Sequence, residues 1–223
     1  MSFAPLGVFC LIGKFVIADG LDIFQDVLAY VVLLIALLLF HAAFTYSIFL
    51  KFIGGLNPLT FYRKMKDVAL FAFSTSSSAA TIPVTLRTVN QDLGVNQNVA
   101  SFVVPVGATI NMDGTAIMQG LATVFIAQMS GIDLTLFQYI QVVLLAVATS
   151  IGTAAVPSAG TITLIIILQQ FNLPLEAIGI ILAVDRVLDM IRTSVNVTGD
   201  AAIACIVAKT ENQLDENIFN SKA

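Results

Sequence analysis

Long apolar runs constrain this chain more than any other feature of its sequence. The hydrocarbon core of a bilayer is about 30 Å thick and needs about 20 mostly apolar helical residues. Four windows qualify as candidate spans: residues 3–18, 29–53, 99–128 and 176–208. The composition agrees, because 58% of the residues are hydrophobic and only 11% are charged, against about 25% in an ordinary soluble domain. We therefore predict an all-α, multi-pass integral membrane protein.

Several functional classes are disfavoured by the same inspection. The net charge of −4 argues against a nucleic-acid partner. Cys10 and Cys205 lie alone in different apolar runs, which favours small buried hydrophobes over a disulfide or a metal site. The first run lacks a basic leader and a small-residue cleavage site, so we expect no cleavable signal peptide. His41 lies in a Leu-rich run, and we expect a packed or interfacial residue rather than a proton relay.

Two further apolar stretches, residues 68–88 and 135–171, are interrupted by small hydroxylated residues and a proline. Their central sequences are FSTSSSAATIP and ATSIGTAAVPSAGT. A long segment with a polar break follows each of them: Pro83 precedes Asp113 by 30 residues, and Pro157 precedes Asp189 by 32. This spacing predicts two re-entrant helical hairpins in an inverted repeat. The alternative is that the small residues only permit close helix packing.

The basic residues predict how these segments cross the membrane. Short loops rich in Lys and Arg stay on the cytoplasmic side. If residues 68–88 enter the membrane and return, then Lys51, the cluster at 63–66, Arg87 and the C-terminal bases all lie on one side, and Lys14 lies within the first span. We therefore expect a cytoplasmic C-terminus.

A polar stripe marks the last apolar run. Successive spacings of 4, 3, 4 and 4 place five residues on one helical face: Asp185, Asp189, Arg192, Asn196 and Asp200. Charges at membrane depth cost at least about 2.5 kcal/mol each, so they should face protein or water. The Arg192 fork suits a carboxylate and Asp189 could accept an ammonium, which together describe an acidic amino acid. An internal Asp189–Arg192 ion pair that only holds the helices together stays open as the alternative.

The run at 99–128 is broken in its middle by the sequence NMDGT. Irregular backbone at membrane depth is tolerated only where it is buried in protein or lines a cavity. Backbone carbonyls together with Asn111, Asp113 and Asp200 would offer hard oxygen ligands. Such a set suits an alkali cation better than a transition metal.

Four motifs, STSSSAATIP, GATINMDGTA, SIGTAAVPSAG and DMIRTSVNVTGD, occur in this order. With these spacings the chain resembles the dicarboxylate/amino acid:cation symporter family, the glutamate and aspartate transporters, over essentially its whole length. Inverted repeats are established for that family. Because family members are longer, the resemblance implies their C-terminal part, with the N-terminal half missing. It also implies a homotrimer built on a scaffold that the missing helices mostly form.

The resemblance also implies a division of the chain. Residues 1–28 would be the last scaffold helix, and 29–208 the transport domain. That domain would comprise a helix at 29–53, hairpin 1 at 68–88, a broken helix at 99–128, hairpin 2 at 135–171 and the last helix at 176–208. Residues 209–223 would form a cytoplasmic tail.

By resemblance, the substrate lies between the two hairpin tips and the last two helices. Eight residues would contact it: Ser78 and Asn196 at the main-chain carboxylate, Arg192 and Thr115 at the side-chain carboxylate, Asp189 and Thr193 at the ammonium, and Val156 and Gly160 as the closing tip. Because Asp189 and Arg192 are both present, an acidic amino acid is favoured over a dicarboxylate or a neutral amino acid.

Three sodium ions are implied in the same way. The first would use Gly107, Asn111, Asn196 and Asp200; the second Thr109, Ser150, Ile151 and Thr153; the third Asn111 and Asp113. The presence of Asp200 and of NMDGT favours sodium over proton coupling. At the second hairpin tip, Ala155 and Ser158 stand where some relatives have glycines, which would stiffen the tip if its backbone needs a positive φ.

We therefore expect a symporter of L-aspartate or L-glutamate that works by alternating access, and not an enzyme. Two intramembrane aspartates could in principle form an aspartyl protease, but the sequences around them lack its motifs. The remaining alternatives are a proton-coupled or dicarboxylate carrier, a substrate-gated anion channel and a non-transporting fragment.

Overall fold

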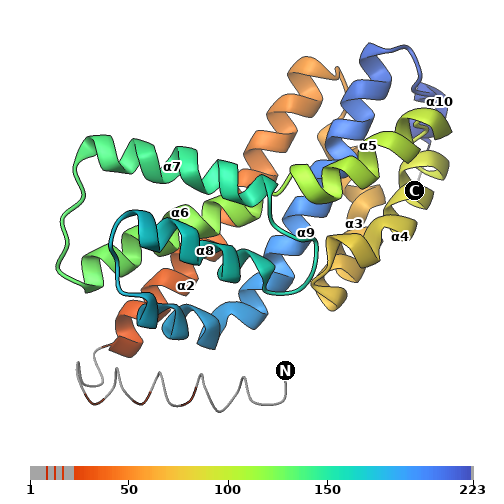
Figure 1. Ribbon diagram of the computed structural model, residues 1–223. Coiled ribbons are helices and arrows are strands. Elements are labelled where there is room, and N and C mark those ends of the chain that lie inside the picture. Colours follow the sequence, from red (N-terminus) through yellow and green to blue (C-terminus); the bar gives the residue numbers. More distant parts are fainter. Residues whose placement is uncertain (1–8, 10–12, 14–16, 18–22, 222–223) are drawn as a thin grey trace.

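The computed structural model describes residues 9, 13, 17 and 23–221, and within that part all regular structure is helical. Most of the predicted segment 1–28, with Cys10 and Lys14, lies outside the described residues. The elements, drawn in Figure 1, are α2 (Ile23–Phe40), η1 (His41–Tyr46), η2 (Phe49–Ile53), α3 (Pro58–Thr75), α4 (Ser78–Gln91), α5 (Gln97–Ile110), α6 (Asp113–Met129), α7 (Leu136–Ile151), α8 (Ala159–Gln170), η3 (Leu175–Ala177), α9 (Ile178–Thr210) and α10 (Glu216–Asn220).

One long apolar helix runs from Ile23 to Ile53. It consists of α2 followed by the wider π-helical turns of η1 and η2. Its most apolar 18-residue window has a mean hydropathy of 2.7, and only 17% of that window is buried. Of the described helices, it is the one that is long and apolar enough to span a membrane by itself. The predicted run at 99–128 is divided between α5 and α6, and α9 carries the polar stripe.

Two helical hairpins are formed by α3 with α4 and by α7 with α8 (Figure 1). In the first, Asn57 caps α3 and Pro58 opens it, which starts the helix before the predicted boundary at 68. Ser76 then turns the chain at φ 51°, and the Ser77 hydroxyl accepts from the Ala80 N–H to cap α4. The small residues that the sequence places at this tip are therefore those that make the turn.

The polar break predicted between the two halves of the 99–128 run is present. Asn111 and Met112 leave helical geometry, with ψ angles of 70° and 54°, and separate α5 from α6. The break leaves the last carbonyls of α5 and the first N–H groups of α6 without partners in their own helices.

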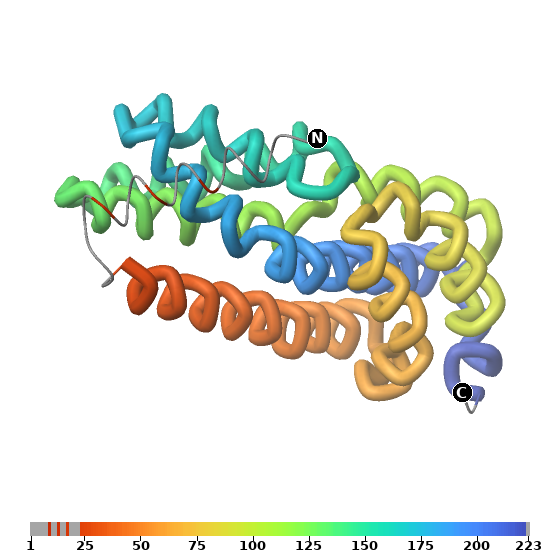
Figure 2. The backbone as a smooth tube through the Cα atoms, turned by 90° about the horizontal axis from the view of Figure 1, so that it is seen from below, coloured from red at the N-terminus to blue at the C-terminus, as the bar shows by residue number. Residues whose placement is uncertain are grey.

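Helix α9 runs through the middle of the molecule, and α2 lies along one side of it (Figure 2). Helix α9 also packs against α3, α4, α5, α6 and α8. All five residues of the polar stripe are buried, as is the free thiol of Cys205. The stripe therefore faces protein, as the cost of exposing charge to lipid requires.

The chain after α9 folds back onto the first hairpin and does not extend away from the protein. We call residues 211–221 the C-terminal clip. Phe219 is fully buried, and the Asp215 N–H donates to the Gly94 carbonyl at 2.8 Å. Lys64 Nζ donates to the carbonyls of Asp92 at 2.8 Å and Ile218 at 2.6 Å. Much of the segment predicted as a tail at 209–223 is thus packed structure.

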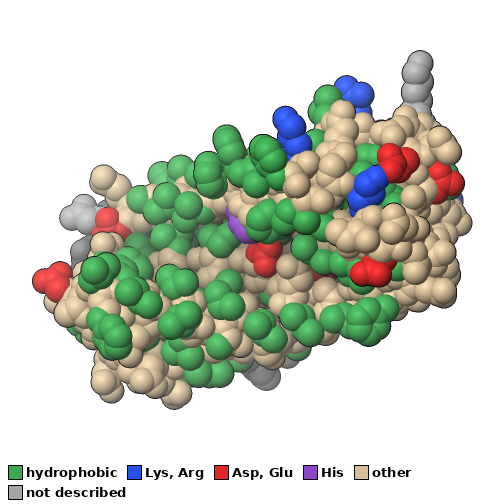
Figure 3. All heavy atoms as spheres, turned by 90° about the horizontal axis from the view of Figure 1, so that it is seen from above, with side chains coloured by type: hydrophobic (Ala, Val, Ile, Leu, Met, Phe, Trp, Pro, Cys, Tyr) green, Lys and Arg blue, Asp and Glu red, His purple; other side chains and the backbone are tan. Residues whose placement is uncertain are grey.

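The surface separates apolar from charged side chains. Figure 3 shows hydrophobic side chains over most of one face, with Lys and Arg gathered toward one end. Large side chains such as Phe102, Phe137, Leu144 and Ile162 are more than half exposed. An apolar belt between charged ends is the surface expected of a protein embedded in lipid.

Candidate functional site

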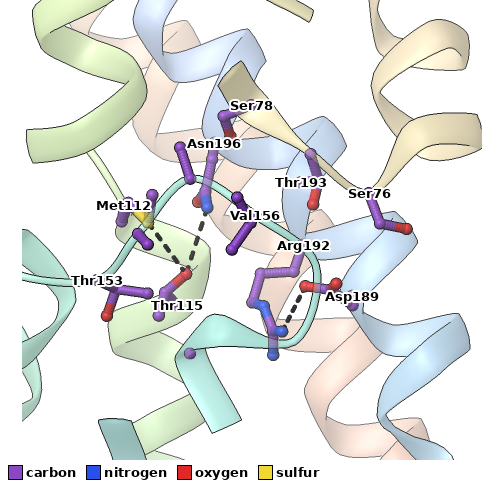
Figure 4. A pocket seen from close by; sticks show the side chains of 13 residues that line it. Ser76, Ser78, Met112, Thr115, Thr153, Val156, Asp189, Arg192, Thr193 and Asn196 are labelled. Atoms are coloured by element: carbon purple, nitrogen blue, oxygen red, sulfur yellow. Dashed lines mark hydrogen bonds and ion pairs between the residues drawn. The ribbon is translucent and has the colours of Figure 1, made fainter. Parts of the chain in front are cut away.

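A small buried pocket lies where the tips of the two helical hairpins meet the start of α6 and the middle of α9 (Figure 4). The structure brings all eight residues predicted to contact substrate to this pocket. Five other residues join them, and one of these, Thr153, was predicted as an ion ligand. The lining residues are Ser76, Ser78, Met112, Thr115, Thr153, Ala154, Ala155, Val156, Gly160, Asp189, Arg192, Thr193 and Asn196.

Arg192 is the dominant charge of the pocket and is only 2% exposed. Its Nη2 lies 2.5 Å from Asp189 Oδ1, and its Nη1 lies 3.3 Å from Asp185 Oδ1. Figure 4 shows Arg192 and Asp189 side by side on α9. The internal ion pair that the sequence left open is therefore present, and both of its members also line the pocket.

The second hairpin tip closes over this pair. The Ser158 N–H donates to Asp189 Oδ2 at 2.9 Å, and Ser158 has a φ of 59°. The expectation about positive φ therefore holds at Ser158 but not at Ala155. A Cβ at Gly160 would lie 2.7 Å from Thr115 Cγ2, so only glycine permits this close approach.

The two hairpin tips are hydrogen-bonded to each other. The Ala155 carbonyl accepts from the Ser77 hydroxyl at 2.8 Å and from the Ala79 N–H at 3.3 Å. The cavity measures about 20 Å³, room for about one water molecule. A ligand larger than water therefore fits only after the lining has moved.

The residues predicted for the first sodium ion gather across α5, the break and α9. Asn111 Nδ2 donates to Asp200 Oδ1 at 3.0 Å, and Asp200 is 2% exposed. A Cβ at Gly107 would lie 2.7 Å from the same Asp200 oxygen. Asn196 Oδ1 accepts from the Gly114 N–H at 2.8 Å, which ties the start of α6 to α9. These four residues bring several oxygen atoms to one buried region.

The residues predicted for the second sodium ion are less closely grouped. The Thr109 hydroxyl is exposed and donates to the Val106 carbonyl of its own helix at 3.0 Å. Ser150 and Thr153 are buried, whereas Ile151 is 47% exposed. No hydrogen bond joins Thr109 to these three described residues.

Asp113, predicted for the third ion, contacts two aromatic side chains of η1. Its Oδ2 lies 3.1 Å from His41 Nε2 and 3.1 Å from the Tyr46 hydroxyl. The sequence suggested no functional partner for His41, and it did not single out Tyr46. Their only signal was a pair of polar aromatic residues, five positions apart, in an otherwise Leu-rich run. Asn111, the other member of the set, directs its amide to Asp200.

Gln119 is a further residue that the sequence analysis did not select. It is fully buried on α6. Its Nε2 donates to the Gly160 carbonyl at 3.0 Å and to the Thr163 hydroxyl at 2.8 Å. Its Oε1 accepts from the Thr149 hydroxyl at 2.8 Å. One amide therefore anchors both arms of the second hairpin, and its only sequence signal was a polar residue in the middle of an apolar run.

Comparison with known proteins identifies the family of this chain. Residues 1–210 match the sodium:dicarboxylate symporter family. The chain is 42% identical to an excitatory amino acid transporter of Caenorhabditis elegans, over 93% of this chain and 42% of that protein. Identity is also 42% to excitatory amino acid transporter 2 of Homo sapiens, over 93% of this chain and 36% of the relative.

Excitatory amino acid transporter 3 of Mus musculus is 40% identical over 100% of this chain and 43% of its own length. The chain thus spans less than half the length of these relatives. The family and these relatives are transporters, not enzymes. Because the match covers nearly the whole chain and confirms the resemblance carried by the four motifs, the chain belongs to the sodium:dicarboxylate symporter family.

Proposed function

We propose that this chain forms the substrate- and ion-binding part of a sodium-coupled symporter of acidic amino acids, L-aspartate or L-glutamate. The main support is that eight residues from four separate motifs line one buried pocket that holds Arg192 and Asp189 side by side. The name of the relatives, excitatory amino acid transporter, agrees with an amino acid substrate.

Substrate binding replaces the ion pair between Arg192 and Asp189 with two ion pairs, one from each of these side chains to the ligand. Arg192 and Thr115 bind the side-chain carboxylate, Asp189 and Thr193 the ammonium, and Ser78 and Asn196 the main-chain carboxylate. Before binding, Arg192 and Asp189 neutralise each other at 2.5 Å. After binding, each of these two side chains has an opposite charge on the ligand, and the main-chain carboxylate of the ligand is held by neutral groups.

Hairpin 2 acts as the gate in this proposal. Opening it breaks the bond from Ser158 to Asp189 and the bonds that the first tip donates to Ala155. Val156 and Gly160 then close over the bound ligand. Both hairpins are re-entrant, and with the helices that follow them they form the inverted repeat.

The charge balance favours cation coupling. Four carboxylates near the pocket and the break, those of Asp113, Asp185, Asp189 and Asp200, are buried or half-buried, and Arg192 supplies one buried guanidinium there. An acidic amino acid adds one more net negative charge, which is costly at membrane depth unless cations accompany it. No group of three or more His, Cys, Asp or Glu side chains within the described residues could hold a metal ion. Carbonyl and amide oxygens would therefore supply many of the ligands, which suits sodium.

The predicted sodium sets and domains complete this proposal. The ions bind at the sets containing Asp200, Thr109 and Asp113. Residues 29–208 form the transport domain, which alternates between the two sides of the membrane against a homotrimeric scaffold that includes residues 1–28. The C-terminus is cytoplasmic.

Titration of L-aspartate into the detergent-purified chain, in sodium and then in potassium, tests this function. We expect saturable binding in sodium and none in potassium. Binding in potassium that strengthens at low pH would indicate a proton-coupled carrier. Current without concentrative uptake in reconstituted vesicles would indicate a channel, and a folded chain that binds in neither salt would be a non-transporting fragment.

A further inference from the structure

Arg192 has two carboxylate partners, and they differ in what else they contact. Asp189 lines the pocket and shares its second oxygen with the Ser158 N–H of the hairpin 2 tip. Asp185 does not line the pocket. Its Oδ1 lies 3.3 Å from Arg192 Nη1, and its Oδ2 is buried without a hydrogen-bond partner in the described structure.

We propose that Asp185 is a positioning residue that keeps the Arg192 guanidinium oriented toward the pocket while Asp189 exchanges partners. This inference rests on the proposed function and adds to it a residue outside the pocket. Asp185 and Arg192 are each only 2% exposed, so water cannot replace their contact. The helix spacing of seven residues places the carboxylate two turns before the guanidinium, on the same face.

Arg192 needs a second partner because Asp189 changes its own partner when the substrate binds. When Asp189 accepts the substrate ammonium, its contact with Arg192 Nη2 weakens. An arginine side chain has several rotatable bonds, and a buried guanidinium without a partner would rotate toward another acceptor. Because Asp185 holds Nη1 from outside the pocket, the Nη2 edge stays free and correctly placed for the incoming carboxylate.

The same geometry makes Asp185 a dedicated partner. Asp189 must serve the hairpin 2 tip, the substrate and Arg192 in turn. Asp185 has no other hydrogen-bond partner among the described residues. Its loss should therefore affect the ligand only through Arg192, a dependence that an experiment can isolate.

A double-mutant cycle with Asp185→Asn and Arg192→Ala tests this role. The Kd of L-aspartate in sodium is measured by calorimetry for the four proteins. We expect Asp185→Asn to raise the Kd about tenfold when Arg192 is present, the scale of one charge-assisted hydrogen bond, and to have no effect in the Arg192→Ala background. Asp185→Glu, which keeps the carboxylate, should recover part of the affinity. An equal effect in both backgrounds, or none in either, would overturn the proposal.

A second readout does not depend on substrate binding. The ¹⁵N spectrum of the arginine guanidinium groups reports whether the Nη atoms of Arg192 exchange by rotation. We expect separate Nη signals in Asp189→Asn, because Asp185 still holds the group, and merged signals in Asp185→Asn/Asp189→Asn. Merged signals in Asp189→Asn alone, or separate ones in the double variant, would contradict the proposal. If the unmodified chain binds no aspartate, the proposed function fails, while this spectrum still decides the role of Asp185.

Discussion

Asn111 Nδ2, on the break between α5 and α6, donates to Asp200 Oδ1 on α9 at 3.0 Å, although 89 residues separate them. The contact brings an amide and a buried carboxylate together beside Gly107. It is the part of the predicted ion sites that the geometry supports best.

Asp200→Asn should weaken sodium dependence. Replacing the carboxylate by an amide removes a negative charge from the first ion set, so the sodium concentration for half-maximal L-aspartate binding should rise about tenfold. The measurement is a sodium titration at fixed L-aspartate. Asp133→Asn, at an exposed loop position, is the matched control. An unaltered sodium titration in Asp200→Asn would count against Asp200 as a ligand.

Arg192→Ala should remove the preference for acidic over neutral amino acids. Truncating one member of a buried charge pair typically costs about 2–5 kcal/mol, so the ratio of Kd values for L-serine and L-aspartate should fall at least about thirtyfold. Arg186→Ala, an exposed arginine on the same helix, should leave the ratio unchanged. If Arg192→Ala retains the preference, the substrate assignment is wrong.

Gly160→Ala should prevent the second hairpin tip from closing. The added methyl group would lie 2.7 Å from Thr115 Cγ2, and overpacking of this kind costs about 1–3 kcal/mol. We expect the Kd of L-aspartate to rise about tenfold. Gly152→Ala serves as the control, because the nearest atom to its Cβ, outside its immediate neighbours, lies at 3.8 Å. Equal effects of the two variants would show that closure does not depend on the glycine at 160.

Phe219→Ala should release the C-terminal clip. The ring is fully buried, and Phe→Ala changes in cores cost about 3–5 kcal/mol. The thermal midpoint should fall, and limited proteolysis should cleave within residues 211–221. Asn217→Ala, at an exposed position of the same helix, should resist the protease as the unmodified chain does. Unchanged proteolysis of Phe219→Ala would mean that the clip is held by its hydrogen bonds alone.

Local sequence was sufficient to predict the helical architecture, the hairpin tips, the break and the polar stripe. Serines and prolines at the tips, the break at NMDGT and the spacing of the stripe each act within a few residues, where backbone preferences and helical periodicity operate. The stripe selected Asp189, Arg192 and Asn196, and side-chain chemistry suggested the roles of the first two. The other five of the eight residues that line the pocket, and their roles, came from the motif resemblance.

Tertiary structure alone decided which side chains pair. His41 meets Asp113 across 72 positions, and Lys64 meets Ile218 across 154. Gln119 joins both arms of a hairpin. Periodicity within one helix specifies a face but not the partner that another helix presents to it. Those partners follow from how the helices pack, because buried polar groups take whichever acceptor the packing brings within reach.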